Sequence, residues 1–423
     1  MTIFHTNGGS LLQLLVPVFA CVAPETALSG PSPDPPSEPD SGEPIEHVRP
    51  YLGAPSDRPW PEVAESEDLG DGDRLYADAT IHELHLTLSD DARASLALSP
   101  SAEVSAGLRW RHDDLRVALR LKGSSSFRTI DQKPSFKIDV HDADPTQRID
   151  GEKRLTLNNM IQDPTMQREH AYYWLAHRLG VPAPRIAYAR VFVNDAEYGL
   201  YSLVETMDEE LIERAFDGDE EGNLYESSGA DLTYARDWFT LEESGGVLAT
   251  PADIEDLVDT AERTRDGGFW DMLQDNFDVP ATLTYWALDI AAGNDDGYAF
   301  NHHNYLLYHA PVADRWSFLP WGTDRSFTRQ VPPTGDLVTP LAGDLVIRCW
   351  EDDTCSDALT TRLREVLDLW DADLPDRLEE DAALIEGACD DDPRKELPCD
   401  PGDLADFVDA RSAYLRSQLE GPS

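Results

Sequence analysis

Residues 286–330 read WALDIAAGNDDGYAFNHHNYLLYHAPVADRWSFLPWGTDRSFTRQ. Carboxylates and amides follow one another in this stretch, before and after an apolar run: Asp295 and Asp296, then Asn301 and Asn304, then Asp324. Acidic and amide oxygens are the ligands that a divalent cation prefers, and a remaining carboxylate can orient a nucleophile. The pattern therefore predicts a metal site for a phosphate-bearing ligand. The alternative is a set of solvated acidic turns.

The chain is long enough for a large core and strongly acidic. It has 423 residues, of which 41% are hydrophobic, and a formal net charge of -48. Such a charge argues against a nucleic-acid partner and against an anionic membrane surface. It leaves the oligomeric state open.

Lysine is scarce, and its placement is uneven. Of 34 basic residues only five are lysines, and Lys122, Lys133 and Lys137 lie close together. A local group of lysines on an acidic chain indicates an anionic ligand, although neutralisation of neighbouring acids would produce the same pattern.

The N-terminal region is typical of an exported protein. The apolar run from Leu11 to Ala20 fits the hydrophobic part of a secretion signal and is too short to span a bilayer, although Lys and Arg are absent before it. It stops at Cys21, as at a bacterial lipoprotein cleavage site, so we expect residues 1–21 to be a signal segment with Cys21 lipidated. A buried apolar segment is the alternative. Residues 22–72 are rich in Pro, Ser and acids and predict a disordered tether.

The other cysteines form two close pairs in the sequence: Cys349 with Cys355, and Cys389 with Cys399. An even number of locally paired cysteines in an exported chain predicts two disulfides. Zinc is the weaker alternative, because the spacings are wide and no histidine lies near either pair.

Alternating apolar residues predict strands from about residue 84 onward. The strand ending at Lys122 runs directly into Gly123, Ser124 and Ser125, a small loop whose backbone N–H groups could approach a phosphate. In the next strand, Lys133 and Lys137 share one face and could reach the same anion.

Helices become frequent later in the chain. Asp163 and Pro164 predict the start of a helix that Gly180 ends. Glu169 lies on its mostly buried side and needs a basic partner, in a structural ion pair or at a ligand site. A hairpin with Asn194 and Asp195 in its turn follows. Further helices are predicted at residues 252–264, 280–292, 358–370 and 404–419. Strands first and helices later predict an α+β fold.

Five segments, taken together, resemble the CotH kinase family of secreted, spore-coat-protein-H-like kinases. They span about residues 76–330 and occur in the family's order: RLKGSSSFRTIDQKPSFKIDV, RLTLNNMIQDPTMQREHAYYWLAHRLGVPAPR, VFVNDAEYGLYSLVE, GNLYE and NDDGYAFNHHNYLLYH…FLPWGTDRSF. The resemblance implies an atypical protein-kinase-like fold of two lobes, a β-rich one over residues 73–205 and a helical one over residues 206–423. It also implies ATP with Mg²⁺ or Mn²⁺ as cofactors.

The resemblance also implies roles for individual residues. Asp296 matches the catalytic aspartate, which would orient the acceptor hydroxyl and take its proton. Asn304 matches a metal ligand, with Asn301 as its rival at the spacing of ordinary kinase catalytic loops. Either Lys133 or Lys137, with Lys137 favoured, is expected to hold the ATP phosphates, and Glu169 is the expected partner of that lysine. Arg168 is an alternative phosphate ligand. The loop residues Ser124 and Ser125 are also expected to bind ATP, and Glu205 is expected near the adenine.

One position departs from the family pattern. Many members read Trp-Asp-x-Asp where this chain has Trp321-Gly322-Thr323-Asp324, so an expected metal ligand is Gly322. Either Asp324 binds the metal instead, or the protein is an inactive, kinase-like surface or coat protein. The favoured expectation is an exported or surface-anchored kinase that phosphorylates Ser or Thr of extracytoplasmic proteins. A kinase-fold enzyme that transfers another group, such as AMP, is a third possibility.

Overall fold

A computed structural model describes residues 72–77, 79–227, 229–233, 238–246, 252–265, 267–328 and 341–420. The predicted signal segment, Cys21 and the tether up to residue 71 lie outside these residues. None of the helices in the described ranges is long and apolar enough to cross a membrane.

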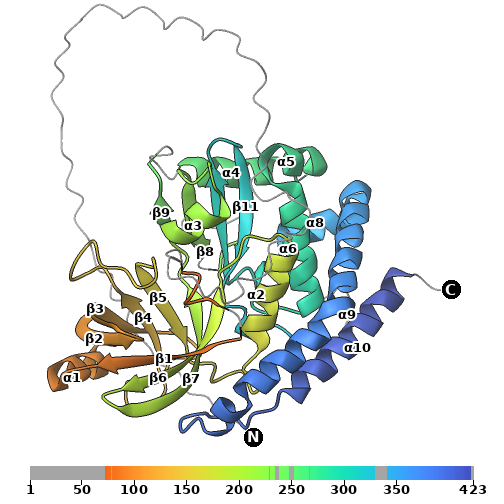
Figure 1. Cartoon of the computed structure of the whole chain (residues 1–423). Helices are drawn as coiled ribbons and strands as arrows, with labels where there is room; N and C mark the ends of the chain where they lie inside the picture. The colour runs from red at the N-terminus through yellow and green to blue at the C-terminus, as the bar shows by residue number, and fades with distance from the viewer. Residues whose placement is uncertain are drawn as a thin grey trace, which may run out of the picture. The chain divides into compact units, whose positions relative to one another are not determined.

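Two sheets and a group of helices make an α+β fold, which confirms the predicted class (Figure 1). The strands are β1 (Ile81–Thr87), β2 (Val104–Trp110), β3 (Asp113–Lys122), β4 (Ser135–Asp139), β5 (Arg154–Asn158), β6 (Ile186–Val193), β7 (Ala196–Glu205), β8 (Asn223–Ser227), β9 (Phe239–Ser244), β10 (Tyr305–Ala310) and β11 (Arg315–Pro320). The helices are α1 (Asp90–Leu98), α2 (Arg168–Arg178), α3 (Glu209–Ala215), α4 (Ala252–Arg263), α5 (Phe269–Asn276), α6 (Val279–Ala292), α7 (Tyr298–Asn301), α8 (Asp344–Glu351), α9 (Asp353–Asp390) and α10 (Gly402–Leu419), with a 3-10 turn at Thr323–Arg325.

The first sheet closes into a barrel in the order β1-β2-β3-β4-β5-β7-β6, and β6 pairs in parallel with β1. Alternate residues of its strands fill the interior, for example Leu119 and Leu121 of β3 and Ile138 of β4. The residues between them face outward. The outer face therefore carries Lys122 and the other polar side chains of these strands.

The second sheet has the order β11-β10-β8-β9, so residues 206–423 contain strands as well as helices. Helices α2, α6 and α9 pack on one another around a large apolar core, with α8 and α10 against α9 (Figure 1). The catalytic-loop candidates lie between α6 and β10, at the junction of this core with the second sheet.

Two helix boundaries differ from the prediction. Helix α2 begins at Arg168 and not near Pro164, because Asp163 forms a turn in which its side chain accepts from the backbone N–H groups of Thr165 and Arg168, each at 2.9 Å. Helix α9 is 38 residues long and extends far beyond residue 370. Its buried apolar residues continue through Leu374, Leu378 and Ile385, so the helix continues past Pro375.

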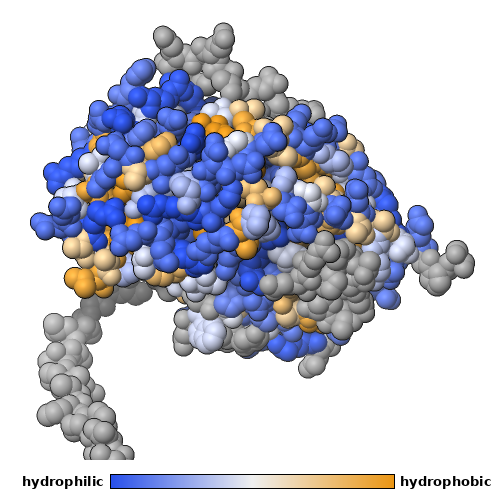
Figure 2. Space-filling model, turned by 90° about the horizontal axis from the view of Figure 1, so that it is seen from below, coloured by the Kyte–Doolittle hydropathy of each residue, from blue (hydrophilic) through white to orange (hydrophobic). Residues whose placement is uncertain are grey.

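The face shown in Figure 2 is mostly hydrophilic, with apolar side chains in small separate patches. That surface agrees with the high content of charged residues.

Candidate functional site

A cavity of about 300 Å³ lies on the outer face of the barrel, where β3 and β5 end and helix α2 and the β10–β11 region approach. Its lining includes residues from five separate parts of the chain: Lys122 with Ser124 and Ser125, Asn158 with Asp163, Glu169, Asp296 with Asn304, and Gly322 with Asp324. The fold thus brings together most of the polar residues that the sequence singles out.

A lysine, an amide and a glutamate form a chain of contacts across one wall of the cavity. The Lys122 ammonium donates to Asn158 Oδ1 at 2.7 Å, and the Asn158 amide donates to both carboxylate oxygens of Glu169 at 3.0 Å. Lys122 also lies 5.1 Å from the centre of the Trp321 ring. Asn158 therefore couples a strand lysine to the helix glutamate without a direct ion pair.

Asp296 is held by the two asparagines that were rivals as metal ligands. Asn301 donates to Asp296 Oδ1 at 2.9 Å, and Asn304 donates to Oδ2 at 3.1 Å. Asn304 also donates to the Gly322 carbonyl at 3.0 Å and lines the cavity. Since its amide nitrogen is used twice, its carbonyl oxygen is the atom that could face a cation.

A buried aspartate shapes the loop that carries Asp296. Asp289, near the end of α6, accepts from Tyr172 at 2.6 Å and from Asn294 at 2.9 Å. A side chain at Gly297 would meet these groups, because its Cβ would lie 2.6 Å from Asp289 Oδ2 and 2.5 Å from Asn294 Nδ2. Burial raises the pKa of Asp289 to about 6. Asp295, which precedes Asp296 in the chain, forms a two-point ion pair with Arg325, a residue that also lines the cavity.

The backbone conformation at position 322 explains why a glycine occurs there. Its φ is 56°, in the left-handed region, and an added Cβ would lie 3.1 Å from Asn304 Nδ2. The turn at Thr323–Arg325 that follows places Asp324 in the cavity. An acid at position 324, and none at 322, is therefore available to a cation.

The charges around the cavity are incompletely balanced. Burial and the neighbouring charge of Asp163 raise the pKa of Asp324 to about 6. Burial and the charge of Asp324 raise the pKa of Glu169 to about 7, and burial lowers that of Lys122 to about 8. Perturbed values that gather in one cavity are typical of a functional site.

The donor set suits a hard divalent cation. Asp324, Asn304 and Asp296 offer oxygen ligands of the type that Mg²⁺ and Mn²⁺ prefer. Among the described residues, three carboxylates whose oxygens lie within 4.8 Å of one another occur at Asp208, Glu209 and Glu210 and not in the cavity. One or two carboxylates with phosphate oxygens are enough for Mg²⁺ at phosphate sites.

The structure places two predicted phosphate ligands away from the cavity. The Lys133 ammonium is 1% exposed and pairs with Asp392 at 2.6 Å, so it cannot share an anion with Lys137. Lys137 lines a neighbouring cavity of about 200 Å³ with Arg120, Thr206 and others.

Two further predicted ligands are engaged in structural contacts. Arg168 approaches Asp163 at 3.4 Å and Asp403 at 3.6 Å. Glu205 is fully buried and accepts from Arg185 and Arg214, both at 2.7 Å. The charges of these arginines overcome the effect of burial and lower the pKa of Glu205 to about 2.

Lys122 was predicted only as one of a group of lysines near an anionic ligand, and Asn158 and Asp163 were not predicted as site residues. A signal for Lys122 was present, because it is one of five lysines and directly precedes the Ser124 loop. Asn158 and Asp163 gave no such signal, since their roles depend on how β5 and α2 meet in space.

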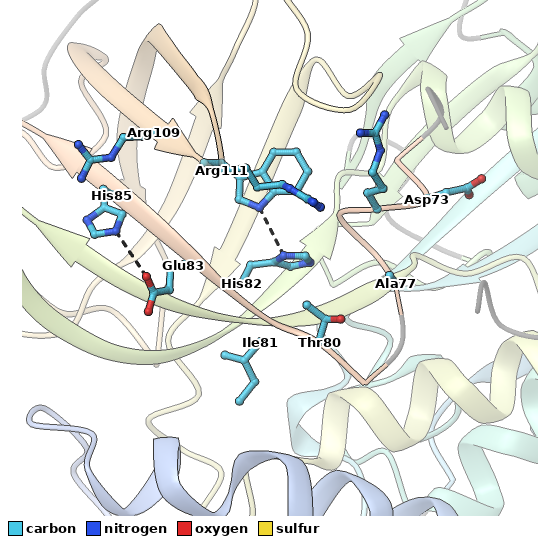
Figure 3. A pocket seen from close by; sticks show the side chains of 11 residues that line it. Asp73, Ala77, Thr80, Ile81, His82, Glu83, His85, Arg109 and Arg111 are labelled. Carbon is cyan, nitrogen blue, oxygen red and sulfur yellow. Dashed lines mark hydrogen bonds and ion pairs between the residues drawn. The ribbon is translucent and has the colours of Figure 1, made fainter. Parts of the chain in front are cut away.

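Another cavity, of about 390 Å³, lies against β1 and β2 (Figure 3). Its wall carries Arg109 and Arg111, and Glu83 lies 3.9 Å from the His85 ring. The buried His82 ring there accepts from Trp110 at 3.3 Å. This cavity contains none of the residues that the sequence predicts for catalysis.

The two predicted disulfides, Cys349–Cys355 and Cys389–Cys399, are confirmed. The first links α8 to the start of α9, and the second closes a loop at the end of α9.

A lysine, a glutamate, an amide-held aspartate and a second aspartate thus gather around one cavity, and these are residue types that kinases use. The chain belongs to the CotH kinase protein family, whose model matches residues 119–415. It is 22% identical over 192 residues to the inner spore coat protein H of Bacillus subtilis (strain 168); the match covers 43% of this chain and 52% of that protein. The chain thus spans about half the length of that relative.

A solved structure gives a more distant likeness. A chain in the Shewanella oneidensis MR-1 toxin–antitoxin complex of HipA, HipB and operator DNA aligns over 71% of this chain and 66% of its own, with 14% identity and a TM-score of 0.33. That score is too low to establish a common arrangement of the two chains.

Proposed function

We propose that this protein is a metal-dependent kinase that transfers the γ-phosphate of ATP to serine or threonine hydroxyls of extracytoplasmic proteins. The observation that carries the proposal is the convergence of Lys122, Glu169, Asp296 and Asp324 on one cavity. These are the residue types that phosphoryl transfer requires: a cation for the phosphates, a carboxylate that positions it, a base for the acceptor and a metal ligand.

Asp296 is the base in this proposal. Each of its oxygens accepts from an asparagine amide, so the carboxylate is held in one orientation at the cavity wall. There it would orient the acceptor hydroxyl and accept its proton. ATP with a divalent cation would supply the phosphoryl group and neutralise the charge that develops during its transfer.

Lys122 takes the phosphate-binding role that was expected of Lys133 or Lys137. It lies at the end of β3, directly before the Ser124 loop, and Asn158 holds its ammonium in position. The cation would be bound by Asp324 with Asn304. The left-handed backbone and the close approach of Asn304 account for a glycine at position 322, and in this proposal Asp324 binds the cation without a second carboxylate there.

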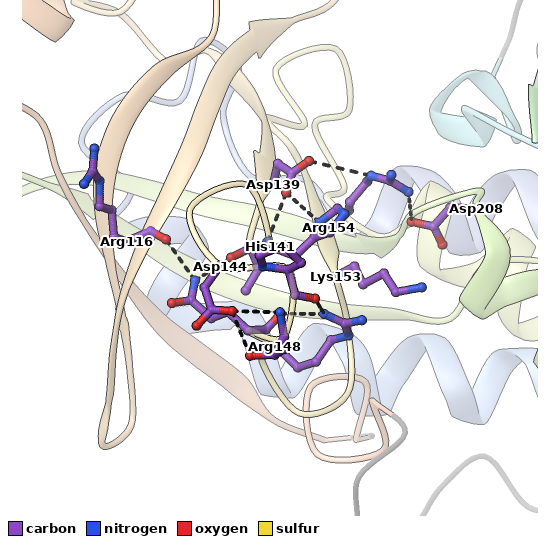
Figure 4. Close-up of polar contacts among 12 residues, drawn as sticks. Arg116, Asp139, His141, Asp144, Arg148, Lys153, Arg154 and Asp208 are labelled. Atoms are coloured by element: carbon purple, nitrogen blue, oxygen red, sulfur yellow. Dashed lines mark hydrogen bonds and ion pairs between the residues drawn. The ribbon is translucent and has the colours of Figure 1, made fainter.

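The adenine ring of the nucleotide would lie along the outer face of the barrel. Ser135 of β4 lines the first cavity, and Lys137, two residues later on the same face, lines the adjacent one. Thr206 and Met207, which follow β7, also line that cavity. Arg154, another lining residue, lies between Asp139 and Asp208 in Figure 4 and forms ion pairs with them at 3.9 and 3.2 Å.

An extracytoplasmic location is part of the proposal. It is supported by the N-terminal sequence, by the two disulfides and by the spore-coat relative. Attachment to a membrane would occur through a lipid on Cys21.

The test is incubation of the purified chain with ATP and Mg²⁺ or Mn²⁺ and a panel of secreted proteins, followed by intact-mass spectrometry. A mass gain of one phosphate on the chain or on a panel protein supports a kinase. A gain of one AMP indicates nucleotide transfer instead. No ATP binding and no gain would support the inactive, coat-protein alternative.

A further inference from the structure

The loop at the end of α9, residues 389–399, reaches from the helices to the barrel. We call it the C-terminal strap. Helix α9 ends beside β7 (Figure 1). The disulfide Cys389–Cys399 closes the strap at that end of the helix. The Lys395 ammonium donates to the carbonyls of Cys389 and Asp390 at 2.8 and 2.6 Å, which fixes the strap to the end of the helix.

Asp392 inserts from the strap into the barrel wall. It is buried and accepts from the Lys133 ammonium at 2.6 Å and from the Leu200 backbone N–H at 2.9 Å. Its approach requires a glycine at position 199, because a Cβ there would lie 2.0 Å from Asp392 Oδ1. The barrel is therefore built to receive this carboxylate.

Other strap residues bind the segment that leads to Lys133. Arg394 donates to the Asp131 carbonyl at 2.8 Å and to the Gln132 carbonyl. Its guanidinium also lies 3.5 Å from the centre of the Tyr198 ring. Arg128 forms an ion pair with Glu396. The strap thus contacts both backbone carbonyls and side chains of residues 128–133.

That segment continues the serine loop of the cavity. The side chain of Asn159 donates to the carbonyls of Ser126 and Lys133, at 3.0 and 2.8 Å, and so joins the two ends of residues 126–133. Ser124 accepts from the Phe127 backbone N–H at 3.2 Å. A displacement of Lys133 would therefore reach the residues at the cavity wall.

We propose that the C-terminal strap positions the serine loop for nucleotide binding, through Asp392, Lys133 and Arg394. This positioning role rests on the proposed function, because the proposed nucleotide supplies the phosphate that the serine loop would bind. A loop whose backbone N–H groups are already ordered loses less conformational entropy when it binds an anion. The disulfide adds to this order by limiting the freedom of the strap.

The two disulfides allow a matched test. The variant Cys389→Ser/Cys399→Ser opens the strap, and Cys349→Ser/Cys355→Ser opens the other disulfide as the control. Two quantities are measured well below the melting temperature: amide hydrogen exchange of residues 123–133 without nucleotide, and the Kd for ATP with Mg²⁺. The strap variant should exchange at least tenfold faster in residues 123–133 and bind ATP about tenfold more weakly. The control should match the wild type in both.

The outcomes separate the two proposals. Unchanged exchange in the strap variant, or equal changes in both variants, would overturn the positioning role. If exchange rises but the Kd does not, the strap is only structural and the positioning proposal fails. If the wild type binds no ATP, the proposed function fails, and the exchange data alone then decide whether the strap orders the loop. Glu396→Gln, which removes only the ion pair to Arg128, gives a milder check in case the double variant does not fold.

Discussion

Two buried glutamates differ in how well their charges are paired. At the end of the barrel, Glu205 is contacted by both Arg185 and Arg214, and its pKa falls to about 2. In the cavity, Glu169 meets Lys122 only through Asn158, and burial raises its pKa to about 7. Paired buried charges are typical of structure, whereas poorly compensated ones indicate a place for a charged ligand.

The largest expected effect on stability comes from replacing the paired glutamate, Glu205. Glu205→Gln leaves Arg185 and Arg214 without their buried carboxylate partner, which should lower the free energy of unfolding by about 3–5 kcal/mol. Urea denaturation measures this. The Kd for ATP, measured on the protein that remains folded, should not change. A large loss of ATP affinity with intact stability would mean that Glu205 belongs to the nucleotide site.

The pH dependence of stability tests the cavity glutamate next. Because the folded-state pKa of Glu169 is raised above 4.5, the folded state binds more protons than the unfolded state between pH 4.5 and about 7. Its contribution to stability is therefore fully present below pH 4.5 and is lost as the pH rises through 7, by about 3 kcal/mol. Glu169→Gln should reduce that fall in denaturation curves recorded across this range, and the raised pKa values of Asp289 and Asp324 account for part of what remains. An unchanged slope would show that Glu169 is not the titrating group.

Replacing Lys122 should weaken ATP binding without lowering the stability of the fold. Lys122→Met removes a buried ammonium whose pKa burial lowers, so the melting temperature should stay the same or rise. The Kd for ATP should increase about tenfold, or about 1.4 kcal/mol. Lys133→Met differs in its effect on stability: it should lower the melting temperature, because Asp392 loses its buried partner, and should weaken ATP binding only through the serine loop. An unchanged Kd in Lys122→Met, or an equal loss of melting temperature in both variants, would contradict the assignment of Lys122.

The smallest expected effect is that of replacing Gly322, the position that departs from the family pattern. Gly322→Ala forces a side chain into the left-handed region beside Asn304, at a cost of roughly 1–2 kcal/mol in stability. Because Asn304 holds Asp296, the rate of transfer should fall more than ATP affinity does. Thermal denaturation and steady-state kinetics measure the two effects. A fully active and equally stable variant would show that the glycine is not required.

The sequence predicted much of the fold through periodicity and turn residues. The strand ending at Lys122, the hairpin with Asn194 and the helix that stops at Gly180 depend on local patterns, and all are present. The disulfides followed from the spacing of the cysteines. The start of α2 was predicted too early, because the side chain of Asp163 can cap a turn as well as a helix.

The site was predictable only in part. Asp296, Asn304 and Asp324 lie in one stretch of sequence, and the fold brings them to one cavity. Which lysine faces that cavity could not be read from the sequence. Lys122 and Lys133 lie on either side of the Ser124 loop in the sequence, and their positions depend on Asn158 and on Asp392, the latter more than 250 residues away from Lys133. Long-range partners of this kind leave no local pattern.

The central claim is that the cavity transfers a phosphoryl group with Asp296 as the base. Its most direct test compares the wild type with Asp296→Asn for phosphate incorporation from ATP in the presence of Mg²⁺ or Mn²⁺, with the Kd for ATP measured in parallel. We predict that the wild type incorporates phosphate and that the variant is slower by about 10²–10⁴-fold with little change in Kd. Equal incorporation by the two proteins, or none by a wild type that binds ATP in the presence of every acceptor tried, would contradict the account.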